Sequence, residues 1–213
     1  METKNTNVVY ENNAVALSGV ISSEAQFSHE VYGEKFYSYK MNVERLSNNS
    51  DEILLTVSER LKGFEDLAVG AKVVVIGQFR SYNKRESGKR NHLLLYVFVR
   101  EIKFVENIEE NVNQITLEGY VCKEAVYRKT PLGREITDLL LAVNRPYGKS
   151  DYIPCICWGR NAKYVSGLNV GQKVLIQGRI QSRDYFKKIS EEEVEKRVAY
   201  EVSVSKVELG TEE

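Results

Sequence analysis

The chain has 213 residues, of which 42% are hydrophobic and 28% are charged, so it holds enough apolar material for one large or two small compact domains. Its 30 basic residues balance 30 acidic ones, which excludes a general attraction to polyanions and leaves only local basic patches to bind nucleic acid. No apolar run is long enough to cross a bilayer, and three cysteines, an odd number, exclude a disulfide framework and fit a reducing cytoplasm.

Residues 1–13 are polar and acidic, unlike the basic and then apolar start of a signal peptide, so we expect neither a leader nor a membrane anchor there. After this arm the apolar residues mostly alternate, as in Val73, Val75 and Phe79, which is the period of half-buried strands. We expect five strands in residues 1–105, with glycines inside the first and fourth, where a bent small barrel needs no side chain. A short helix is expected at residues 58–67, between strands three and four.

Residues 106–112 form a polar and acidic stretch that suits a linker, because the sequence after it repeats the sequence before it at a spacing of about 100 residues. A period this long indicates a duplicated domain rather than a solenoid, whose units recur about every 20 to 50 residues. The matched positions are Gly19 and Gly119, Gly33 and Gly133, Val43 and Val143, Arg45 and Arg145, Gly77 and Gly178, and Ser81 and Ser182.

The second half shows the same alternation, as in Val174, Ile176 and Ile180, and a short helix is expected at residues 161–165. Three strands, a helix and two strands, closed by bends, is the order of the OB-fold. The sequence therefore predicts an all-β protein with two tandem five-stranded OB-fold Greek-key barrels, each with a short helix between strands three and four. We expect the first domain at residues 1–105, the linker at 106–112 and the second domain at 113–213.

A series of motifs covers nearly all of residues 113–209. They are Ile115-x-Leu117-x-Gly119-x-Val121, Arg128-x-Thr130-Pro131-x-Gly133, Leu141 to Pro146, Asp151 to Gly159, Val170-Gly171-x-Lys173-Val174, Gly178 to Arg183 and Tyr200-x-Val202-x-Val204. In this order they resemble the bacterial single-stranded DNA-binding protein family. The first half resembles the family mainly through the repeat, because it lacks the Asn-Arg-Pro and Trp-Gly features. The resemblance implies sequence-nonspecific binding of single-stranded DNA in replication, recombination or repair.

Single-stranded DNA needs flat rings on which its bases stack and cations for its phosphates, and stacking is worth about 1–3 kcal/mol per base. In strand three of the second half, alternation points Ile153, Cys155 and Cys157 into the barrel. The opposite face then lies outside, where the family uses matching positions for stacking; the alternative is that Trp158, the one tryptophan, belongs to the core. The outward set is Tyr152, Pro154, Ile156 and Trp158.

The fourth strand of each half places basic and aromatic side chains in one outward row, although exposed charges also serve solubility. Hairpins between strands one and two and between strands four and five are where OB-folds hold oligonucleotides. The outward rows are Arg179, Gln181, Arg183 and Tyr185 in the second half and Gln78, Arg80, Tyr82 and Lys84 in the first. The expected nucleic-acid-binding residues are Trp158, Tyr152, Arg179, Arg183, Tyr185, Phe186, Lys187, Arg128, Lys129, Arg134, Arg145, Arg80, Tyr82, Lys84, Arg85 and Arg90.

The two halves are not expected to bind equally. Strand three of the first half has the outward face Glu52, Leu54, Thr56 and Ser58, which carries no ring and one negative charge. We therefore expect the first barrel to contact DNA more weakly, through strand four and its hairpin, or to serve partly for assembly.

Nothing in the sequence indicates an enzyme. The histidines His29 and His92 have no cysteine or carboxylate at metal-ligand spacing, so we expect no metal site and no cofactor. A redox role for Cys155-x-Cys157 is weaker than a packing role, because both residues face inward on one strand. No phosphate-binding lysine loop or catalytic motif is present, and we expect no small-molecule substrate.

Two other functions stay open: an accessory protein of the primosome or of recombination that mainly holds protein partners, and an RNA-binding OB module. Family members typically end in an acidic tail that recruits enzymes, whereas this sequence ends at Gly210-Thr211-Glu212-Glu213, soon after the last expected strand. That departure leaves the recruiting role in doubt and suggests a specialised or mobile-element version. The family commonly assembles four barrels, so the resemblance implies a homodimer of this two-barrel chain.

Overall fold

The computed structural model describes residues 11–45, 47, 49–84, 92–188 and 194–210. These residues are mostly in strands, so the predicted all-β class is confirmed. The elements are β1 Asn13–Ile21, β2 Gln26–Val31, β3 Glu34–Glu44, β4 Ser50–Ser58, a 3-10 turn Phe64–Asp66, β5 Lys72–Lys84, β6 His92–Phe104, β7 Asn113–Val121, β8 Val126–Lys129, β9 Glu135–Arg145, a 3-10 turn Pro146–Gly148, β10 Lys149–Trp158, α1 Gly159–Val165, β11 Lys173–Lys188 and β12 Val194–Leu209.

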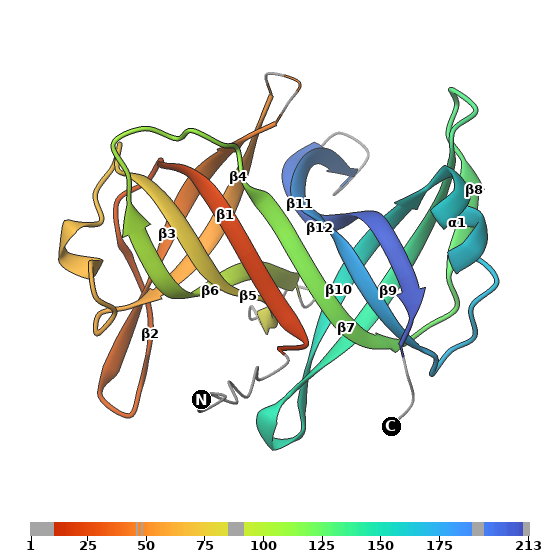
Figure 1. The fold of residues 1–213 in the computed structure, drawn as a ribbon, viewed down its shortest axis with the longest axis horizontal. Coiled ribbons are helices and arrows are strands. Elements are labelled where there is room, and N and C mark those ends of the chain that lie inside the picture. Colours follow the sequence, from red (N-terminus) through yellow and green to blue (C-terminus); the bar gives the residue numbers. More distant parts are fainter. Residues whose placement is uncertain (1–10, 46, 48, 85–91, 189–193, 211–213) are drawn as a thin grey trace, which may run out of the picture.

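The strands pair in two closed circuits that lie side by side (Figure 1). In the first circuit β1 pairs with β3, β3 with β4, β4 with β6, β6 with β5, and β5 with β1 again. The second circuit repeats this order with β7, β9, β10, β12 and β11. Only the β4–β6 and β10–β12 pairs are parallel among the described strands.

Each half of the chain has one strand more than the sequence predicts, because the expected first strand is split. β2 and β8 follow β1 and β7 after a four-residue break, and every residue of both is exposed. They pair only with β3 and β9, the strands that continue past the ends of β1 and β7. The chain must leave the closed circuit at this point to form an outer hairpin, and the break is where it turns.

Inward-facing side chains of alternate strand positions fill each circuit. The first holds Leu17, Met41 and Phe79, and the second holds Leu117 and Ile153, all fully buried. Burying one such side chain is worth about 1.5–3 kcal/mol relative to exposing it, so these two cores hold the circuits together.

Glycines allow the circuits to close. A Cβ on Gly19 would lie 2.3 Å from the carbonyl oxygen of Asn42 in β3, and one on Gly119 would lie 2.5 Å from that of Ala142 in β9. Gly77 and Gly178 sit at β-bulges, and a Cβ on either would lie 2.3 Å from a carbonyl oxygen of the neighbouring strand. The expected reason for these glycines, close approach in a bent sheet, therefore agrees with the backbone geometry.

Replacing Gly178 with alanine is expected to lower the free energy of unfolding by about 1–3 kcal/mol, since the new Cβ would clash with backbone that cannot easily move. Gly167→Ala is the matched control, because its Cβ would meet nothing closer than the carbonyl oxygen of Tyr164 at 3.6 Å. That change should stay within about 0.5 kcal/mol of the parent protein. Urea denaturation of both variants tests the difference, and equal stabilities would show that the bulge tolerates a side chain.

The helix predicted at residues 58–67 is wrong in type: only a three-residue 3-10 turn, Phe64–Asp66, forms there. Gly63 immediately before it adopts φ of 90°, outside the helical region, and so ends any continuous helix. In the second half α1, Gly159–Val165, lies between β10 and β11 and packs Ala162 and Val165 into the core. The repeat therefore keeps its strands better than its helix.

An antiparallel contact between β1 and β7 joins the two circuits. At its centre Val15 lies opposite Ile115, and these are equivalent positions of the repeat. An antiparallel pair centred on equivalent positions relates the two circuits by an approximate two-fold axis. The linker passes close to this contact, because the Ser18 hydroxyl donates to the Glu110 carbonyl at 2.7 Å and the Val112 amide donates to Ser18 Oγ at 2.7 Å.

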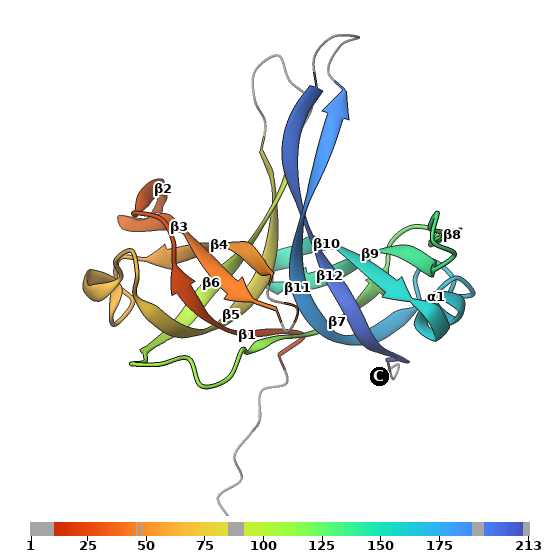
Figure 2. The ribbon, with the colours of Figure 1, turned by 90° about the horizontal axis from the view of Figure 1, so that it is seen from above.

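The hairpins β5–β6 and β11–β12 extend beyond the circuits on the same side of the molecule (Figure 2). Both come from the fourth and fifth long strands of their circuits, as the repeat requires. Among the described residues there is no helix with the length and apolar character needed to cross a membrane.

Candidate nucleic-acid interface

The third long strand of the second circuit, β10, has the two faces that alternation predicts. Cys155 and Cys157 point inward and are buried, whereas Tyr152 and Trp158 are 44% and 38% exposed. Both rings therefore lie open on the outer wall, and Trp158 is not a core residue. Ile156 departs from the predicted outward set, because it is only 5% exposed.

The two cysteines are packing residues. Burial raises the pKa of the Cys157 thiol to about 12, and burial raises that of Cys155 well above its usual value. Both thiols are therefore protonated at neutral pH, the form that neither attacks nor binds metal. Among the described residues no group of three or more His, Cys, Asp or Glu side chains is placed to hold a metal ion.

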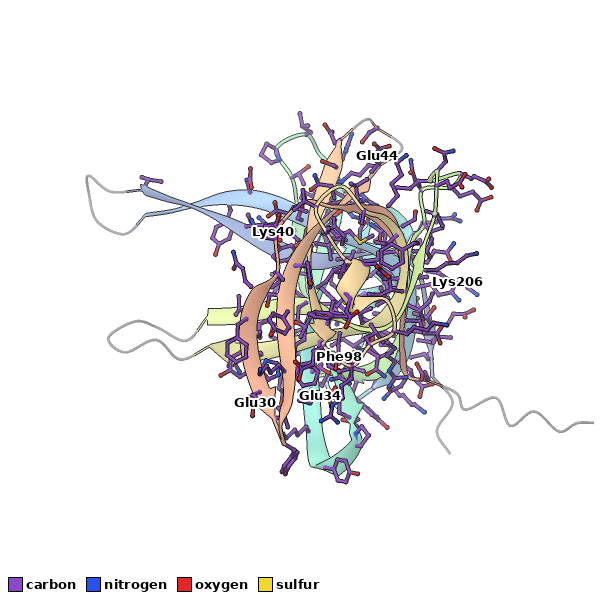
Figure 3. The ribbon with its side chains drawn as sticks, turned by 90° about the vertical axis from the view of Figure 1, so that its left-hand side faces the viewer. Glu30, Glu34, Lys40, Glu44, Phe98 and Lys206 are labelled. Atoms are coloured by element: carbon purple, nitrogen blue, oxygen red, sulfur yellow. The ribbon has the colours of Figure 1, made fainter. Side chains whose placement is uncertain are left out.

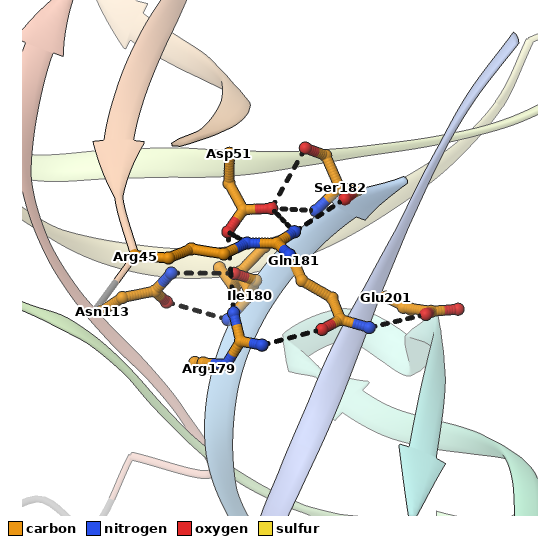
Figure 4. Close-up of polar contacts among 8 residues, drawn as sticks. All are labelled: Arg45, Asp51, Asn113, Arg179, Ile180, Gln181, Ser182 and Glu201. Carbon is orange, nitrogen blue, oxygen red and sulfur yellow. Dashed lines mark hydrogen bonds and ion pairs between the residues drawn. The ribbon is translucent and has the colours of Figure 1, made fainter. Parts of the chain in front are cut away.

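The outward row on β11 is a hydrogen-bonded chain rather than a set of independent cations (Figure 4). Arg179 Nη2 donates to Gln181 Oε1 at 3.2 Å, and Gln181 Nε2 donates to Glu201 Oε1 at 2.7 Å. Arg183 Nε reaches the other oxygen of Glu201 at 3.4 Å, but its side chain is still 55% exposed. Arg183 is thus available to a ligand, while Gln181 is 9% exposed and committed to the protein.

The corresponding row on β5 has a different chemistry. The Arg80 guanidinium lies 3.8 Å from the centre of the Phe98 ring, which Figure 3 shows on the first circuit. Arg80 Nη2 donates to Gln78 Oε1 at 2.9 Å. Tyr82 is 58% exposed. The β5 row therefore offers one open ring and one stacked, half-buried cation.

The predicted loop residues are only partly within the described structure. Arg128 forms an ion pair with Asp138 at 2.8 Å, whereas Lys129 and Arg134 are exposed in the β8–β9 hairpin. Tyr185 is half-buried on β11. The predicted sites outside the described residues are Arg85 and Arg90, and the described part also excludes the side chains of Lys84, Phe186 and Lys187.

Two equivalent polar clusters, which the sequence reasoning missed, hold the circuits against each other. In one, Arg45 Nε donates to Asp51 Oδ2 at 2.7 Å, and the amide of Ser182 on β11 donates to Asp51 Oδ1 at 2.6 Å (Figure 4). In the other, Arg145 Nε lies 3.1 Å from Asp151 Oδ2. The Ser81 amide of β5 completes the second cluster by donating to Asp151 Oδ1 at 2.7 Å.

The structure thus places Arg145 at this contact rather than on the outer wall, with its side chain 26% exposed. The sequence holds a signal for the clusters: an arginine stands six residues before an aspartate in both halves, at Arg45 and Asp51 and at Arg145 and Asp151. Each aspartate is fully buried, so each needs a cation or donors nearby.

The two buried carboxyl groups differ in pKa. Burial opposes ionisation of Asp51, but hydrogen bonds from Arg45 and Ser182 outweigh it and hold the pKa below its usual value. Burial raises the pKa of Asp151, and the bonds from Ser81 and the attraction of Arg145 offset this only in part. The hydrogen bonds and cation around Asp51 therefore offset the cost of burying its charge more completely than those around Asp151.

Equivalent asparagines complete the contact. Asn13 Nδ2 donates to the Phe79 carbonyl at 2.7 Å and its Oδ1 accepts from the Phe79 amide at 2.9 Å. Asn113 makes the same pair of bonds with Ile180, both at 2.8 Å. These bonds pin the bulge regions of β5 and β11 to β1 and β7, which fixes where the outward rows begin.

The outer face of β4 lacks a platform like that of β10. Leu54 and Ser58 are half-buried, Thr56 is buried, and Glu52 pairs with Lys40 at 2.8 Å. None of these side chains carries a ring. The described aromatic wall therefore belongs to the second circuit.

Comparison with known proteins gives one family for part of this chain: residues 112–209 match the profile described as the single-strand binding protein family. Single-stranded DNA-binding protein 3 of Listeria innocua is 33% identical over 81 residues, which cover 35% of this chain and 51% of that protein. Single-stranded DNA-binding protein A of Bacillus subtilis is also 33% identical over 81 residues, with 35% and 47% covered. The chain thus spans about half the length of the curated relatives it matches.

Solved structures similar to the whole chain come from Thermus aquaticus. A deletion mutant of its single-stranded DNA binding protein superposes with a TM-score of 0.73 at 19% identity, covering 94% of this chain and 95% of that one. The wild-type protein gives a TM-score of 0.69 at 21% identity, covering 94% of both chains. At these identities the likeness concerns the fold, and it extends over both circuits.

Proposed function

We propose that the chain binds single-stranded DNA without regard to sequence and catalyses no reaction, because residues 112–209 match the single-strand binding protein family. In the cell it would protect single strands in the cytoplasm during replication, recombination or repair. The observation that carries the proposal is the pair of open rings, Tyr152 and Trp158, on the outer wall of β10. A buried pair could not have stacked with bases.

The spacing of these rings suits contact with several nucleotides of single-stranded DNA rather than with a single base. Tyr152 and Trp158 are six residues apart on β10, which corresponds to about 20 Å at 3.3 Å per residue. β12 lies between β10 and β11, so the arginines of β11 stand about 10 Å across the sheet from the rings. A single strand along β10 would place bases on the rings and phosphates toward Arg183.

Charge favours this wall over the far end of the first circuit. Glu30 and Glu34 lie near the β2–β3 turn, as Figure 3 shows, and Glu34 approaches Arg60 only to 3.6 Å. Lys129 and Arg134 are exposed on the second circuit. A polyanion would therefore approach the second circuit and avoid the β2–β3 end of the first.

We also propose the finer architecture that the family implies. Each strand circuit is taken as an OB-fold Greek-key barrel, with domains at residues 1–105 and 113–213 and a linker at 106–112. Two chains would supply four barrels as a homodimer. Light scattering of the purified protein measures its mass in solution, and a strict monomer would contradict the proposed homodimer.

The deciding experiment is a titration of the purified chain with oligo-dT of increasing length at several salt concentrations. Trp158 is the one tryptophan, so fluorescence quenching reports on the wall directly. We expect quenching by oligo-dT that weakens with salt, as phosphate binding releases counterions. Duplex DNA and RNA of equal length serve as competitors, and preference for either, or no binding of oligo-dT, would overturn the proposal.

A further inference from the structure

A cleft of about 250 Å³ lies where the first circuit meets the β9–β10 hairpin of the second. Its lining includes three arginines, Arg80, Arg100 and Arg145, from both halves of the chain. The remaining lining residues are Glu11, Asn12, Asn13, Gln78, Asn144 and Pro146. All of the cationic side chains in this lining are guanidinium groups, which are well suited to phosphate oxygens.

Two of these arginines have a carboxylate partner and the third has none in its described contacts. Arg100 pairs with Glu11, and Arg145 faces the buried Asp151. Arg80 contacts the Gln78 amide and the Phe98 ring, and its Nε is buried without a hydrogen-bond partner in the described structure. A cation that is half-buried with an unused donor is costly unless an anion arrives.

The electrostatics of Arg80 agree with this geometry. Burial lowers the pKa of its guanidinium and repulsion by Arg145 and Arg100 acts in the same direction, whereas Tyr96 and the Asp151 carboxylate act in the opposite direction. The group still carries its charge at neutral pH, because arginine is not deprotonated in proteins. The cleft therefore gathers three guanidinium groups against the two carboxylates of Glu11 and Asp151, and this leaves an excess of positive charge that an anion would balance.

The equivalent place in the other half provides an internal comparison. The residue opposite Arg80 across the strand pair is Tyr96, whereas the matched pair in the second half is Gln181 and Glu201. Gln181 there is neutral and donates to the Glu201 carboxylate at 2.7 Å. The second site is thus satisfied internally, whereas the first presents a cation that forms no ion pair within 4 Å among the described residues.

The cleft also lies next to the proposed stacking wall. The amide of Tyr152 donates to the hydroxyl of Ser81, the residue after Arg80, at 2.8 Å. Arg80 therefore stands at the Tyr152 end of β10. Single-stranded DNA that leaves the wall at this end toward the first circuit would therefore come close to the cleft.

From these observations we propose that the Arg80 cleft binds one backbone phosphate of the single strand as it crosses from the second circuit to the first. The inference rests on the proposed function and assigns a bridging site to it. It also gives the first circuit a defined contact with DNA, although its β4 wall carries no rings.

The test is the salt dependence of oligo-dT affinity, measured by anisotropy of a labelled oligonucleotide. Arg80→Gln, which copies the residue of the second half, should reduce the steepness of log K against log salt by about 0.7, the value for one phosphate of a single strand. The same term predicts about fivefold weaker binding at 0.1 M salt. Arg60→Gln removes an equal charge outside the cleft, from a side chain that is 64% exposed, and should leave the slope unchanged.

A second variant keeps the test decisive if Arg80→Gln unfolds. Glu11→Gln frees Arg100 from an exposed partner and should tighten binding, by up to about fivefold at 0.1 M salt. An unchanged slope in a folded Arg80→Gln protein, or weaker binding by Glu11→Gln, would overturn the inference alone. Failure of the parent protein to bind oligo-dT would overturn the proposed function and this site together.

A thermal-shift experiment with inorganic phosphate separates the two sources of the anion. Millimolar phosphate is compared with chloride of equal ionic strength. If phosphate stabilises the parent protein but not Arg80→Gln, and the oligo-dT slope of Arg80→Gln is unchanged, the cleft binds a free anion and the inference is overturned. A reduced slope in Arg80→Gln supports the strand phosphate.

Discussion

Replacing Arg45 with alanine is expected to lower the free energy of unfolding by about 3–5 kcal/mol, because it removes the closest cation from the buried Asp51 carboxylate and leaves Arg179, at 3.7 Å, as the remaining described one. Asp51 is fully buried, and Arg45 reaches it through two guanidinium nitrogens. Arg45 Nη2 also donates to the Ser182 carbonyl on β11 at 2.9 Å. The substitution therefore weakens the joint between the two circuits as well as the first circuit itself, and urea denaturation measures the loss.

Arg60→Ala is the matched control, because Arg60 approaches Glu34 only to 3.6 Å and lies largely in water. An exposed pair of this kind is worth about 0–1 kcal/mol. Similar losses in the two variants would mean that the Asp51 cluster does not contribute to stability beyond an ordinary surface charge.

The Arg45 effect should also depend on pH. The folded-state pKa of Asp51 lies below its unfolded value of about 3.9, so its ionised form stabilises the parent protein at neutral pH. That contribution is lost as the pH falls through the folded-state pKa. Without Arg45 burial favours the neutral acid, so the stability difference between parent and variant should shrink on acidification. A difference that stays constant from neutral pH into this acid range would contradict the assigned cause.

Replacing Trp158 with alanine is expected to weaken oligo-dT binding by about 1–3 kcal/mol, or about five- to 150-fold, through the loss of one stacked base. The indole is 38% exposed on β10, so its removal should leave the core intact. Because the variant lacks the only tryptophan, its affinity must be read from the anisotropy of a labelled oligonucleotide.

Trp158→Phe controls for the flat surface, since it keeps a ring at the same place and should retain most of the affinity. Tyr82→Ala tests the expected inequality of the halves and should cost less than Trp158→Ala, although Tyr82 is the more exposed ring at 58%. Equal losses at Trp158 and Tyr82 would show that both halves bind alike.

The strand pattern and the faces of β10 could be predicted from the sequence because they depend on local alternation. Ile153, Cys155 and Cys157 point inward and Trp158 outward, as a period of two requires. The glycines could also be predicted, since a bent sheet brings backbone against backbone wherever strands cross. The same alternation along β10 also predicts that the rings of Tyr152 and Trp158 lie on the outer wall.

Contacts between distant segments could not be predicted in this way. Arg145 stands six residues before Asp151, but nothing in its own neighbourhood indicates that this pair meets the β5 strand of the other half. The same is true of Gln181, which alternation places outside but which is buried and hydrogen-bonded to Glu201. The helix at residues 58–67 failed for a local reason, because Gly63 takes a positive φ that the pattern of apolar residues does not reveal.

The pairing of Val15 with Ile115 has a consequence for how the protein behaves on dilution. Two separate single-copy chains would make this contact only at concentrations above their dissociation constant. One covalent chain brings the partners together at an effective concentration set by the short connection between them, which reaches the millimolar range for short linkers. The joined pair should therefore persist at protein concentrations below the dissociation constant at which separate subunits would dissociate.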